Sequence, residues 1–476
     1  MRFFISLAII ASFLQQPATA QQKWNLKTIV EYAMANNLTV KQSEVQVKFA
    51  GLNYNQSKLD RYPSANFSGN TSLNSGSNQD PTTFGRITQT YISAGFQLQT
   101  SADIFNFYSK QNFILANQWE AKAAAANVGK IKNDIALSAA NAYLQILLSI
   151  EQEKVTLVQL EQTRAQLSNT RKQVDAGALP ELNALQLEAQ LAQDSVNYIT
   201  TRGNTTQSIL TLKSFMNIDA AEPFEVDVPP VEAIPVEALA DLQPDYVFKQ
   251  ALANQPQQLY NEYRLKAAEK NVLASKSGMY PSLGAFASIG SGYNNQARQV
   301  TGSEPVFLPV GNVLVGGTNY QVFPVQPFTN YSYSKRTFPG QLSDNFRQSI
   351  GLSLSVPILN GASLRTAYEK SKLNVSSLQI QKEQDNQQLK QDIYAAYNAA
   401  TVALEKFTAS QKAVNSAEQT YSFAGKRFNV GMLSTFDLIT TQNNVLRAKL
   451  EYTINRFDYV FKMKVLEFYK GVGLKL

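Results

Sequence analysis

The sequence predicts a mixed α and β membrane protein, in which a trimeric, twelve-stranded β-barrel with four strands per chain is continued by a long α-helical coiled-coil barrel. Three observations support this fold class. The 476-residue chain is similar to itself at two fixed shifts, four short segments alternate between apolar and polar residues, and the longest segments repeat apolar residues every three or four positions. Such a pattern indicates an internal duplication rather than three unrelated domains.

The composition excludes most enzyme classes. The chain has no His and no Cys, so it cannot form a Ser/His/Asp or Cys/His nucleophile, a Cys/His zinc site or a disulfide. Lys and Arg total 43 against 36 Asp and Glu, yet no run of five basic residues occurs, as a nucleic-acid-binding arm would need. We therefore expect no enzyme activity, no metal, no cofactor and no nucleic-acid partner.

The first 20 residues are typical of a signal peptide. Arg2 precedes an apolar stretch, residues 3–14, and Ala18-Thr19-Ala20 forms a small-residue cleavage site. A short buried helix is the alternative, but the segment has no polar face for a soluble helix to expose. No Cys follows the cleavage site, so we expect an exported chain without an amino-terminal lipid anchor.

The duplication is visible when the chain is compared with itself. At a shift of 218 residues Tyr62-Pro63-Ser64 matches Tyr280-Pro281-Ser282, and at a shift of 254 residues Gly177 matches Gly431. The second repeat therefore contains an insertion of 36 residues. The predicted organisation is a first repeat over residues 21–216, a proline-rich linker over 217–244 and a second repeat over 245–476.

Each repeat is expected to begin with one helix and to continue with two strands. Strands are predicted near residues 64–73, 91–100, 282–291 and 347–357, because apolar and small polar residues alternate there with period two. Such segments are typical of outer-membrane strands, although half-buried strands of a soluble sandwich would alternate in the same way. No run of about 18 apolar residues follows the signal, so strands would have to cross a membrane.

The remaining segments predict two long helical hairpins with turns near residues 177 and 431. In the second repeat the 3, 4, 3, 4 spacing of a coiled-coil seam runs from Ile393 to Phe428, and it returns from Phe436 to Val460 through Asn443. The first hairpin is expected to bury these residues: Leu157, Leu160, Arg164, Leu167, Arg171 and Val174, answered by Leu182, Leu185, Ala189, Ala192, Val196 and Ile199. A single helix from Asn106 to Ala176 would be about 105 Å long.

Four strands cannot close a barrel, and open strand edges in lipid leave backbone groups unpaired at a cost of several kcal/mol each. Two chains would supply eight strands and three chains twelve. An eight-stranded barrel is filled by its own side chains, whereas twelve strands can leave a lumen. A conducting function therefore favours a homotrimer.

With these features the chain resembles the TolC-type outer-membrane efflux proteins, over the signal, both repeats, the two Tyr-Pro junctions and the turns at Gly177 and Gly431. The resemblance implies a trimeric duct in the cell outer membrane that extends into the periplasm. It also implies three partners besides the sister chains: outer-membrane lipid, a periplasmic adaptor (membrane fusion) protein and an inner-membrane transporter. The transporter would supply the energy, while the duct passively exports small molecules or secreted products.

The two hairpin turns are the candidate adaptor-docking tips. By the resemblance, Val430-Gly431-Met432 matches the family's tip motif, whereas Ala176-Gly177-Ala178 departs from it. A structural role is also expected, because glycine at a helix end supplies a left-handed cap. The two roles are compatible, since an adaptor would grip a helical hairpin by its tip.

The candidate residues of the periplasmic entrance are Asp437, Phe428, Leu433 and Asn183. Asp437 aligns with an acidic position that forms a ring in the family, where three carboxylates around one axis would repel one another and attract cations. Alternatively, Ser434 and Asp437 form a capping box. Asn183 and Leu433 stand where relatives carry an acid and an Arg, so the family's latch does not transfer, and packing of Phe428 and Leu433 is the hypothesis for closure.

The insertion lies within residues 292–346, between the strands of the second repeat, and is rich in Gly, Pro and aromatic residues. It is expected to be extracellular, either at the outer mouth or as a poorly ordered loop. Lys335-Arg336 is a weak candidate for binding lipopolysaccharide phosphates.

A trimeric coiled-coil surface adhesin or structural stalk without transport is the alternative function. It explains the heptads and the export, but not the duplication or the paired strands. An exported enzyme would need a convergent pair of acids, and the helices place none where a pocket is expected. Ion conduction separates the duct from both alternatives.

Overall fold

The computed structural model describes residues 23–79, 85–229 and 234–471, so the expected signal peptide, residues 1–20, lies outside the described residues. The chain forms two compact units. The first comprises residues up to Leu52, Asn117–Ala268 and the residues from Leu373 on, and the second comprises Asn53–Ala116 and Glu269–Lys372. Within the described part of the chain, none of the helices combines the length and hydrophobicity that a membrane-crossing helix needs.

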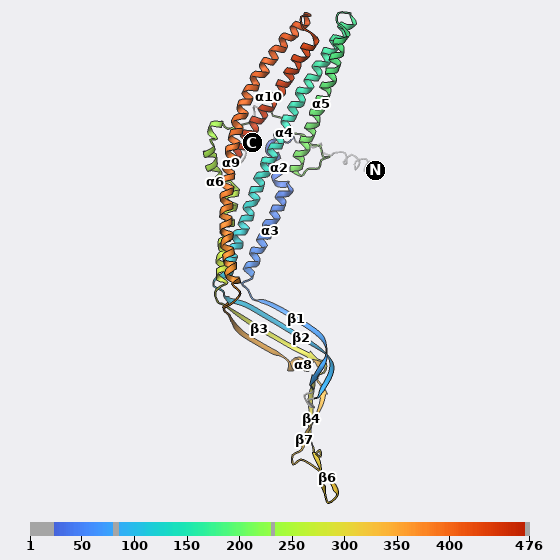
Figure 1. Ribbon diagram of the computed structural model, residues 1–476, viewed down its shortest axis with the longest axis vertical. Helices are drawn as coiled ribbons and strands as arrows, with labels where there is room; N and C mark the ends of the chain where they lie inside the picture. Colours follow the sequence, from blue (N-terminus) through green and yellow to red (C-terminus); the bar gives the residue numbers. More distant parts are fainter. Residues whose placement is uncertain (1–22, 80–84, 230–233, 472–476) are drawn as a thin grey trace, which may run out of the picture. The chain divides into compact units, whose positions relative to one another are not determined.

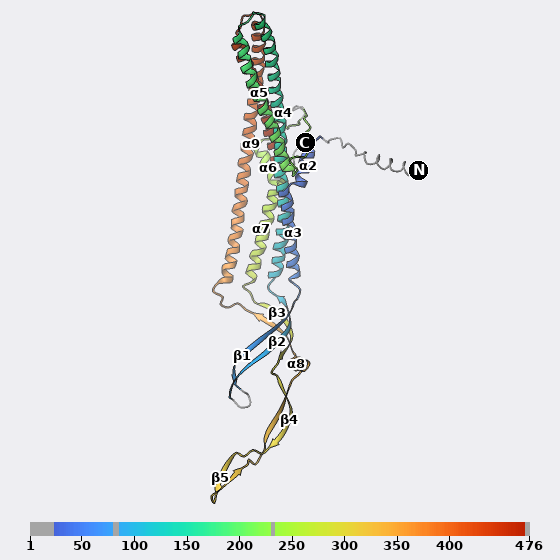
Figure 2. The same cartoon turned by 90° about the vertical axis from the view of Figure 1, so that its right-hand side faces the viewer.

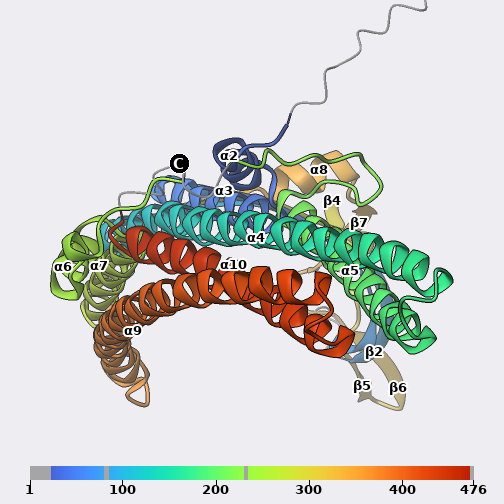
Figure 3. The ribbon, with the colours of Figure 1, turned by 90° about the horizontal axis from the view of Figure 1, so that it is seen from above.

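Corresponding long helices appear in both repeats (Figure 1). The first repeat contains α2 (Leu26–Asn36), α3 (Leu38–Leu59), α4 (Ser109–Asp175) and α5 (Glu181–Met216). The second contains α6 (Pro244–Asn254), α7 (Pro256–Ser277), α9 (Ser363–Asn429) and α10 (Thr435–Tyr469), preceded by the short helix η2 (Leu239–Asp241). In the first unit α10 contacts α5, so the hairpins α4–α5 and α9–α10 lie side by side (Figure 3).

Each repeat begins with two helices where the sequence predicted one. Asn37 ends α2 and Gln255 ends α6, each with an extended ψ (134° and 128°), and Pro256 then opens α7. The side-chain amides secure both breaks in the same way. Asn37 Nδ2 donates to the carbonyl of Phe215 at 2.8 Å, and Gln255 Nε2 donates to that of Tyr469 at 3.2 Å. The second break also has a local cause, because the residue before a proline disfavours the helical conformation, whereas the partner of Asn37 in the first break is distant in the sequence.

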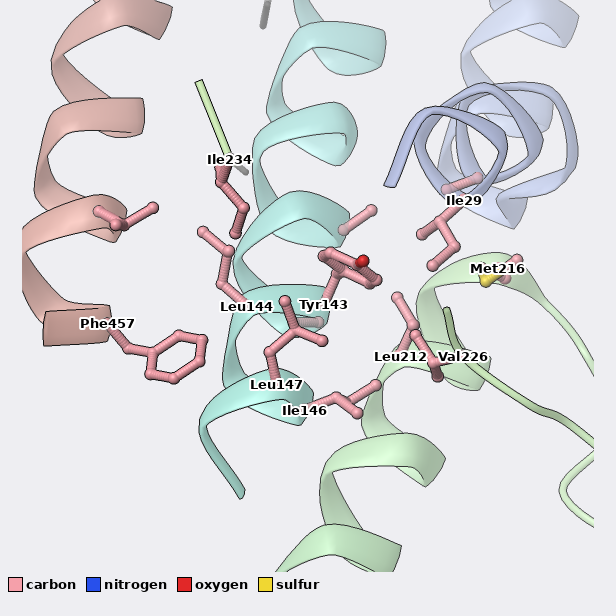
Figure 4. Packing of buried hydrophobic residues seen from close by; sticks show 14 residues of the cluster. Ile29, Tyr143, Leu144, Ile146, Leu147, Leu212, Met216, Val226, Ile234 and Phe457 are labelled. Atoms are coloured by element: carbon pink, nitrogen blue, oxygen red, sulfur yellow. The ribbon is translucent and has the colours of Figure 1, made fainter. Parts of the chain in front are cut away.

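Two hydrophobic cores of the first unit are copies of one another. Figure 4 shows the first, where Tyr143 of α4 lies between α2 and α5. The corresponding buried pairs are Ile29 and Val247, Ala33 and Ala251, Ala139 and Ile393, Ile146 and Ala400, and Leu212 and Leu466. Ala139 corresponds to the larger Ile393, and Ile146 corresponds to the smaller Ala400, so these two exchanges offset one another in side-chain volume.

The proline-rich linker is docked on the helices of the first unit. Trp24 forms a parallel β-bridge with Val226. The ammonium group of Lys213 donates to linker carbonyls, including that of Ala220 at 2.8 Å. Glu467, which corresponds to Lys213 in the second repeat, accepts from the backbone N–H of Glu237 at 2.7 Å. Equivalent positions of opposite charge thus anchor the two ends of the linker.

The seam predicted for α9 is confirmed, because its residues from Ile393 to Phe428 are buried or half-buried. The seam predicted for the first hairpin is partly right on α4, where Leu160 is buried and Leu167, Arg171 and Val174 are half-buried, but it is wrong at the exposed Leu157 and Arg164 and on α5. The predicted face of α5 is exposed, at Leu182, Leu185, Ala189, Ala192, Val196 and Ile199, and α4 instead buries Thr156, Gln159, Leu160, Thr163 and Thr170. Hydroxyl groups pair across this hairpin, with Thr156 Oγ1 and Thr201 Oγ1 2.7 Å apart, so hydrogen bonds select the buried face.

The second unit contains a four-stranded antiparallel sheet of order β1-β2-β3-β8. Its strands are β1 (Ser64–Gln79), β2 (Arg86–Phe105), β3 (Ser282–Asn294) and β8 (Arg347–Ser355). The register aligns Phe67, Leu98 and Ile289 on one face, and the other face carries polar groups such as Gln99 and Ser288. β1 and β2 extend beyond the predicted 64–73 and 91–100, because polar residues continue the pairing as far as Gln79 and Arg86.

The insertion forms regular structure, so the expectation of a poorly ordered loop is wrong. β4 (Arg298–Val306) pairs with β7 (Phe328–Lys335), and β5 (Gly311–Val315) pairs with β6 (Thr318–Val322). Within the second unit, β5 and β6 lie at the end of this ladder farthest from the four-stranded sheet (Figures 1 and 2). Helix α8 (Phe338–Asp344) is held on β3 by buried Gln341, which accepts from the N–H of Asn294 at 2.8 Å and donates to its carbonyl at 2.9 Å.

Candidate functional site

The two hairpin turns have the same backbone conformation. Gly177 and Gly431 both have φ of +73°, a left-handed conformation that glycine adopts without strain. In each turn the glycine N–H donates to the carbonyl three residues before it, and the next N–H donates to the carbonyl five residues before it, at 2.8 to 2.9 Å. This is a Schellman cap, so the predicted structural role of both glycines is confirmed.

Both turns lie at the same end of the helices of the first unit (Figure 1). Val430 and Met432 are 69% and 70% exposed, and Ala176 and Ala178 are also exposed. A Cβ atom on either turn glycine would meet nothing within 4 Å. Backbone conformation, rather than close packing, therefore requires glycine here, and the surface around each turn is open to a partner.

Asp437 takes part in capping at the start of α10. Ser434 is the N-cap residue, and its Oγ accepts from the N–H of Asp437 at 3.1 Å and donates to a carboxylate oxygen of Asp437 at 2.7 Å. The predicted N-cap is thus confirmed, and a carboxylate in the first turn is favourable toward the helix dipole. Asp437 is nevertheless exposed, so capping leaves its charge accessible.

The other predicted entrance residues are divided between the two turns. Phe428 and Leu433 flank the second turn and are both half-buried. Asn183 is half-buried in the first turn of α5, where its N–H donates to the carbonyl of Pro180 at 3.1 Å. The structure therefore brings Phe428 and Leu433 to one turn, as their proposed packing requires.

A buried polar layer joins the two hairpins and had not been predicted. Asp194 of α5 is 1% exposed and accepts from Thr163 Oγ1 at 2.7 Å and from Gln190 Nε2 at 2.8 Å. Gln442 of α10 is also 1% exposed, and its Nε2 donates to Thr163 Oγ1 at 3.1 Å. One threonine hydroxyl thus connects α4, α5 and α10.

An amide pair extends this layer. The side chains of Gln190 and Asn443 exchange two hydrogen bonds, at 3.1 and 3.2 Å, between α5 and α10. Asn443 occupies a position of the predicted seam, and a polar residue at a seam position was the one feature of the sequence that could have indicated this polar layer. Gln442 Oε1 is buried and has no hydrogen-bond partner among the residues that the structure describes, so the layer is not fully satisfied there.

Arg171, predicted as a seam residue, lies at the edge of the first hairpin. Its guanidinium contacts Glu188 and, at 2.6 Å, Glu181, both on α5. These hydrogen bonds raise the pKa of Arg171 above its ordinary value. The contacts connect α4 to α5 close to the turn, but exposed ion pairs contribute little stability.

The polar face of the sheet borders a hollow of about 950 Å³ in the second unit. Its lining includes Asn70, Gln97, Ser288 and Arg347. Uncharged amide and hydroxyl groups dominate this surface. Such a lining suits a water-filled passage that accepts varied solutes rather than one ligand.

Arg336, considered for phosphate binding, is already engaged. Its Nε and Nη2 donate to the two carboxylate oxygens of Asp344 at 2.6 and 2.9 Å, and Nη1 donates to Gln299 at 2.5 Å. The bidentate contact lowers the pKa of Asp344. Arg336 therefore secures α8 to β4, which does not favour a role in binding lipopolysaccharide.

Comparison with known proteins identifies relatives across nearly the whole chain. A family model described as outer membrane efflux protein matches residues 29–217 and 247–459. The toluene efflux pump outer membrane protein TtgC of Pseudomonas putida is 20% identical over 470 residues, which cover 96% of this chain and 86% of TtgC. The outer membrane protein TolC of Escherichia coli is 20% identical over 373 residues, 76% of this chain and 66% of TolC.

Other comparisons are shorter or structural. The probable outer membrane lipoprotein SilC of Salmonella typhimurium is 23% identical over 269 residues, and the chain spans only 54% of the length of SilC. The solved structure of CusC has a TM-score of 0.72 at 16% identity, covering 96% of this chain and 98% of CusC. VceC from Vibrio cholerae has a TM-score of 0.70 at 14% identity, covering 94% and 96%. These two structures share the fold.

Proposed function

We propose that three copies of this chain form one passive duct. The chain belongs to the outer membrane efflux protein family, so it is an outer-membrane channel component of a tripartite efflux or secretion system rather than an enzyme. The duct would combine a twelve-stranded barrel with a helical barrel in the periplasm. A periplasmic adaptor would connect it to an energised inner-membrane transporter.

The observation that supports a trimer is the four-stranded sheet with two open edges. β1 and β8 form its two edges, one face is apolar and the other borders the polar hollow. Lipid does not tolerate unpaired strand edges, so β8 of one chain would pair with β1 of the next. Three chains would form a closed barrel of twelve strands around a lumen, whereas two chains would form an eight-stranded barrel filled by its own side chains.

The periplasmic end of the proposed duct is formed by the two turns. We assign adaptor docking to the exposed residues around Gly177 and Gly431, and the narrowing of the entrance to Asp437 with Phe428 and Leu433. The polar layer around Thr163 would hold the two hairpins together in the closed state. Its contacts join α10 to α4 and α5, so separating the hairpins would break them.

Planar-bilayer recording with native mass spectrometry of the same purified sample tests this function. We expect a trimer that conducts ions without an energy source. A trimer that inserts but never conducts would support the stalk alternative, and a monomer that is soluble without detergent would contradict both.

A further inference from the structure

The inserted arm, residues 298–335, has an uncharged outer part. No Asp, Glu, Lys or Arg occurs between Pro305 and Ser334, although 17% of the chain is charged. Its apolar side chains are exposed, with Leu314 of β5 at 70% and Val325 at 99%. Several exposed apolar side chains in one short segment are typical of an interaction site.

The outermost ladder is too small to be stable alone. β5 and β6 have five residues each, all exposed, and among the described strands each pairs with the other alone. A two-stranded hairpin in water is marginally stable at best and needs a further strand or a packed face. Natural edge strands usually carry charges that prevent pairing with another chain, and these two edges carry none.

On the premise of the trimeric duct proposed above, we propose that the arms of the three sister chains pair through β5 and β6 and cap the extracellular mouth. β5 of one arm would run antiparallel to β6 of the next, so three hairpins would close into a ring without free edges. The barrel holds the arms together at high effective concentration, which favours pairing within one trimer over pairing between trimers.

The absence of charge favours a second copy of this chain over other occupants. Lipid headgroups are recognised by Lys and Arg, and charged protein surfaces by complementary charge. The outer part of the arm offers neither kind of group. An identical uncharged edge matches it both in backbone hydrogen bonding and in polarity.

The cysteine-free chain allows a direct test, because one introduced cysteine reports on one position. The full mature trimer carrying Leu314→Cys, reconstituted as one trimer per nanodisc, is treated with a short flexible bis-maleimide. We expect cross-linked pairs of chains at a yield that does not change on dilution. The matched control adds Asn312→Lys alone, which places a charge on β5 opposite the uncharged Gln321 of the same hairpin and so discourages pairing with another chain without like charges facing each other within the arm. In the control we expect loss of the cross-link, full labelling by a monofunctional maleimide and a larger single-channel conductance.

The possible failures are distinguishable. A trimer that labels fully but does not cross-link overturns the pairing of arms and leaves the duct intact, whereas a monomeric preparation overturns the duct itself. A cross-link that disappears on dilution reports contact between trimers and overturns the cap. A cross-link that persists in the lysine control overturns pairing through strand edges. Binding of the uncross-linked Leu314→Cys protein to phosphatidylcholine vesicles would instead assign the arm to a lipid surface.

Discussion

Substitution of Thr163 tests whether the polar layer holds the hairpins together. Thr163→Val preserves the shape of the side chain and removes the hydroxyl that donates to Asp194 at 2.7 Å and accepts from Gln442 at 3.1 Å. The bond to Asp194 lies within the first hairpin, so only the bond to Gln442 of α10 is broken when the hairpins separate. Leaving the buried Gln442 amide unpaired in the joined state costs about 1–3 kcal/mol, which would lower the ratio of joined to separated hairpins by roughly 5- to 150-fold.

Single-channel recording measures that ratio as the time spent in the closed and open states. Thr163→Ser is the matched control, because it keeps the hydroxyl and loses one methyl group. We expect Thr163→Val to be open for much longer than the wild type and Thr163→Ser to resemble the wild type. Circular dichroism melting establishes that both variants are folded. Identical gating of the two folded variants would refute the latch.

Four further predictions follow from the described contacts. Leu212→Ala and Leu466→Ala should each lower the free energy of unfolding by about 2–5 kcal/mol, measured by thermal circular dichroism, and a marked difference between them would contradict the equivalence of the two cores. Gly431→Ala should cost about 1–2 kcal/mol because φ is +73°, and it should weaken capture by the purified adaptor, whereas unchanged stability would argue against the left-handed cap. Burial, with repulsion from the Asp227 carboxylate, raises the pKa of Tyr143 to about 12 from 10.0. The contribution of Tyr143 to the free energy of unfolding is therefore fully present below pH 10 and is lost as the pH rises to about 12, because the tyrosine ionises in the unfolded chain before it ionises in the folded one. Tyr143→Phe should remove that part of the alkaline loss of stability, at a cost of about 1 kcal/mol for its hydrogen bond to the Asp227 carbonyl at 2.9 Å, and an unchanged pH profile would count against it. Asp437→Asn should leave the fold intact and reduce block of the channel by divalent cations, and equal block would argue against an acidic ring.

Local chemistry in the sequence determined the repeated parts of this protein. Spacing of two residues revealed the faces of the sheet, and glycine at equivalent positions identified both turns. The same two shifts relate buried core residues that the structure shows, such as Ile29 to Val247 and Leu212 to Leu466. These features could be predicted from the sequence because each depends on residues close together in the chain, or on a fixed shift between the two repeats.

The tertiary structure alone decided which face of α5 is buried and that the first helix of the first repeat breaks at Asn37. An apolar pattern predicted burial of Leu182 and Leu185, but the buried side of this hairpin is selected by polar partners on other helices. Thr163 and Gln442 are 279 residues apart, and Asn37 contacts a carbonyl 178 residues away. Side-chain hydrogen bonds between different helices have no fixed sequence separation, so their partners can be identified only when the helices are placed beside one another.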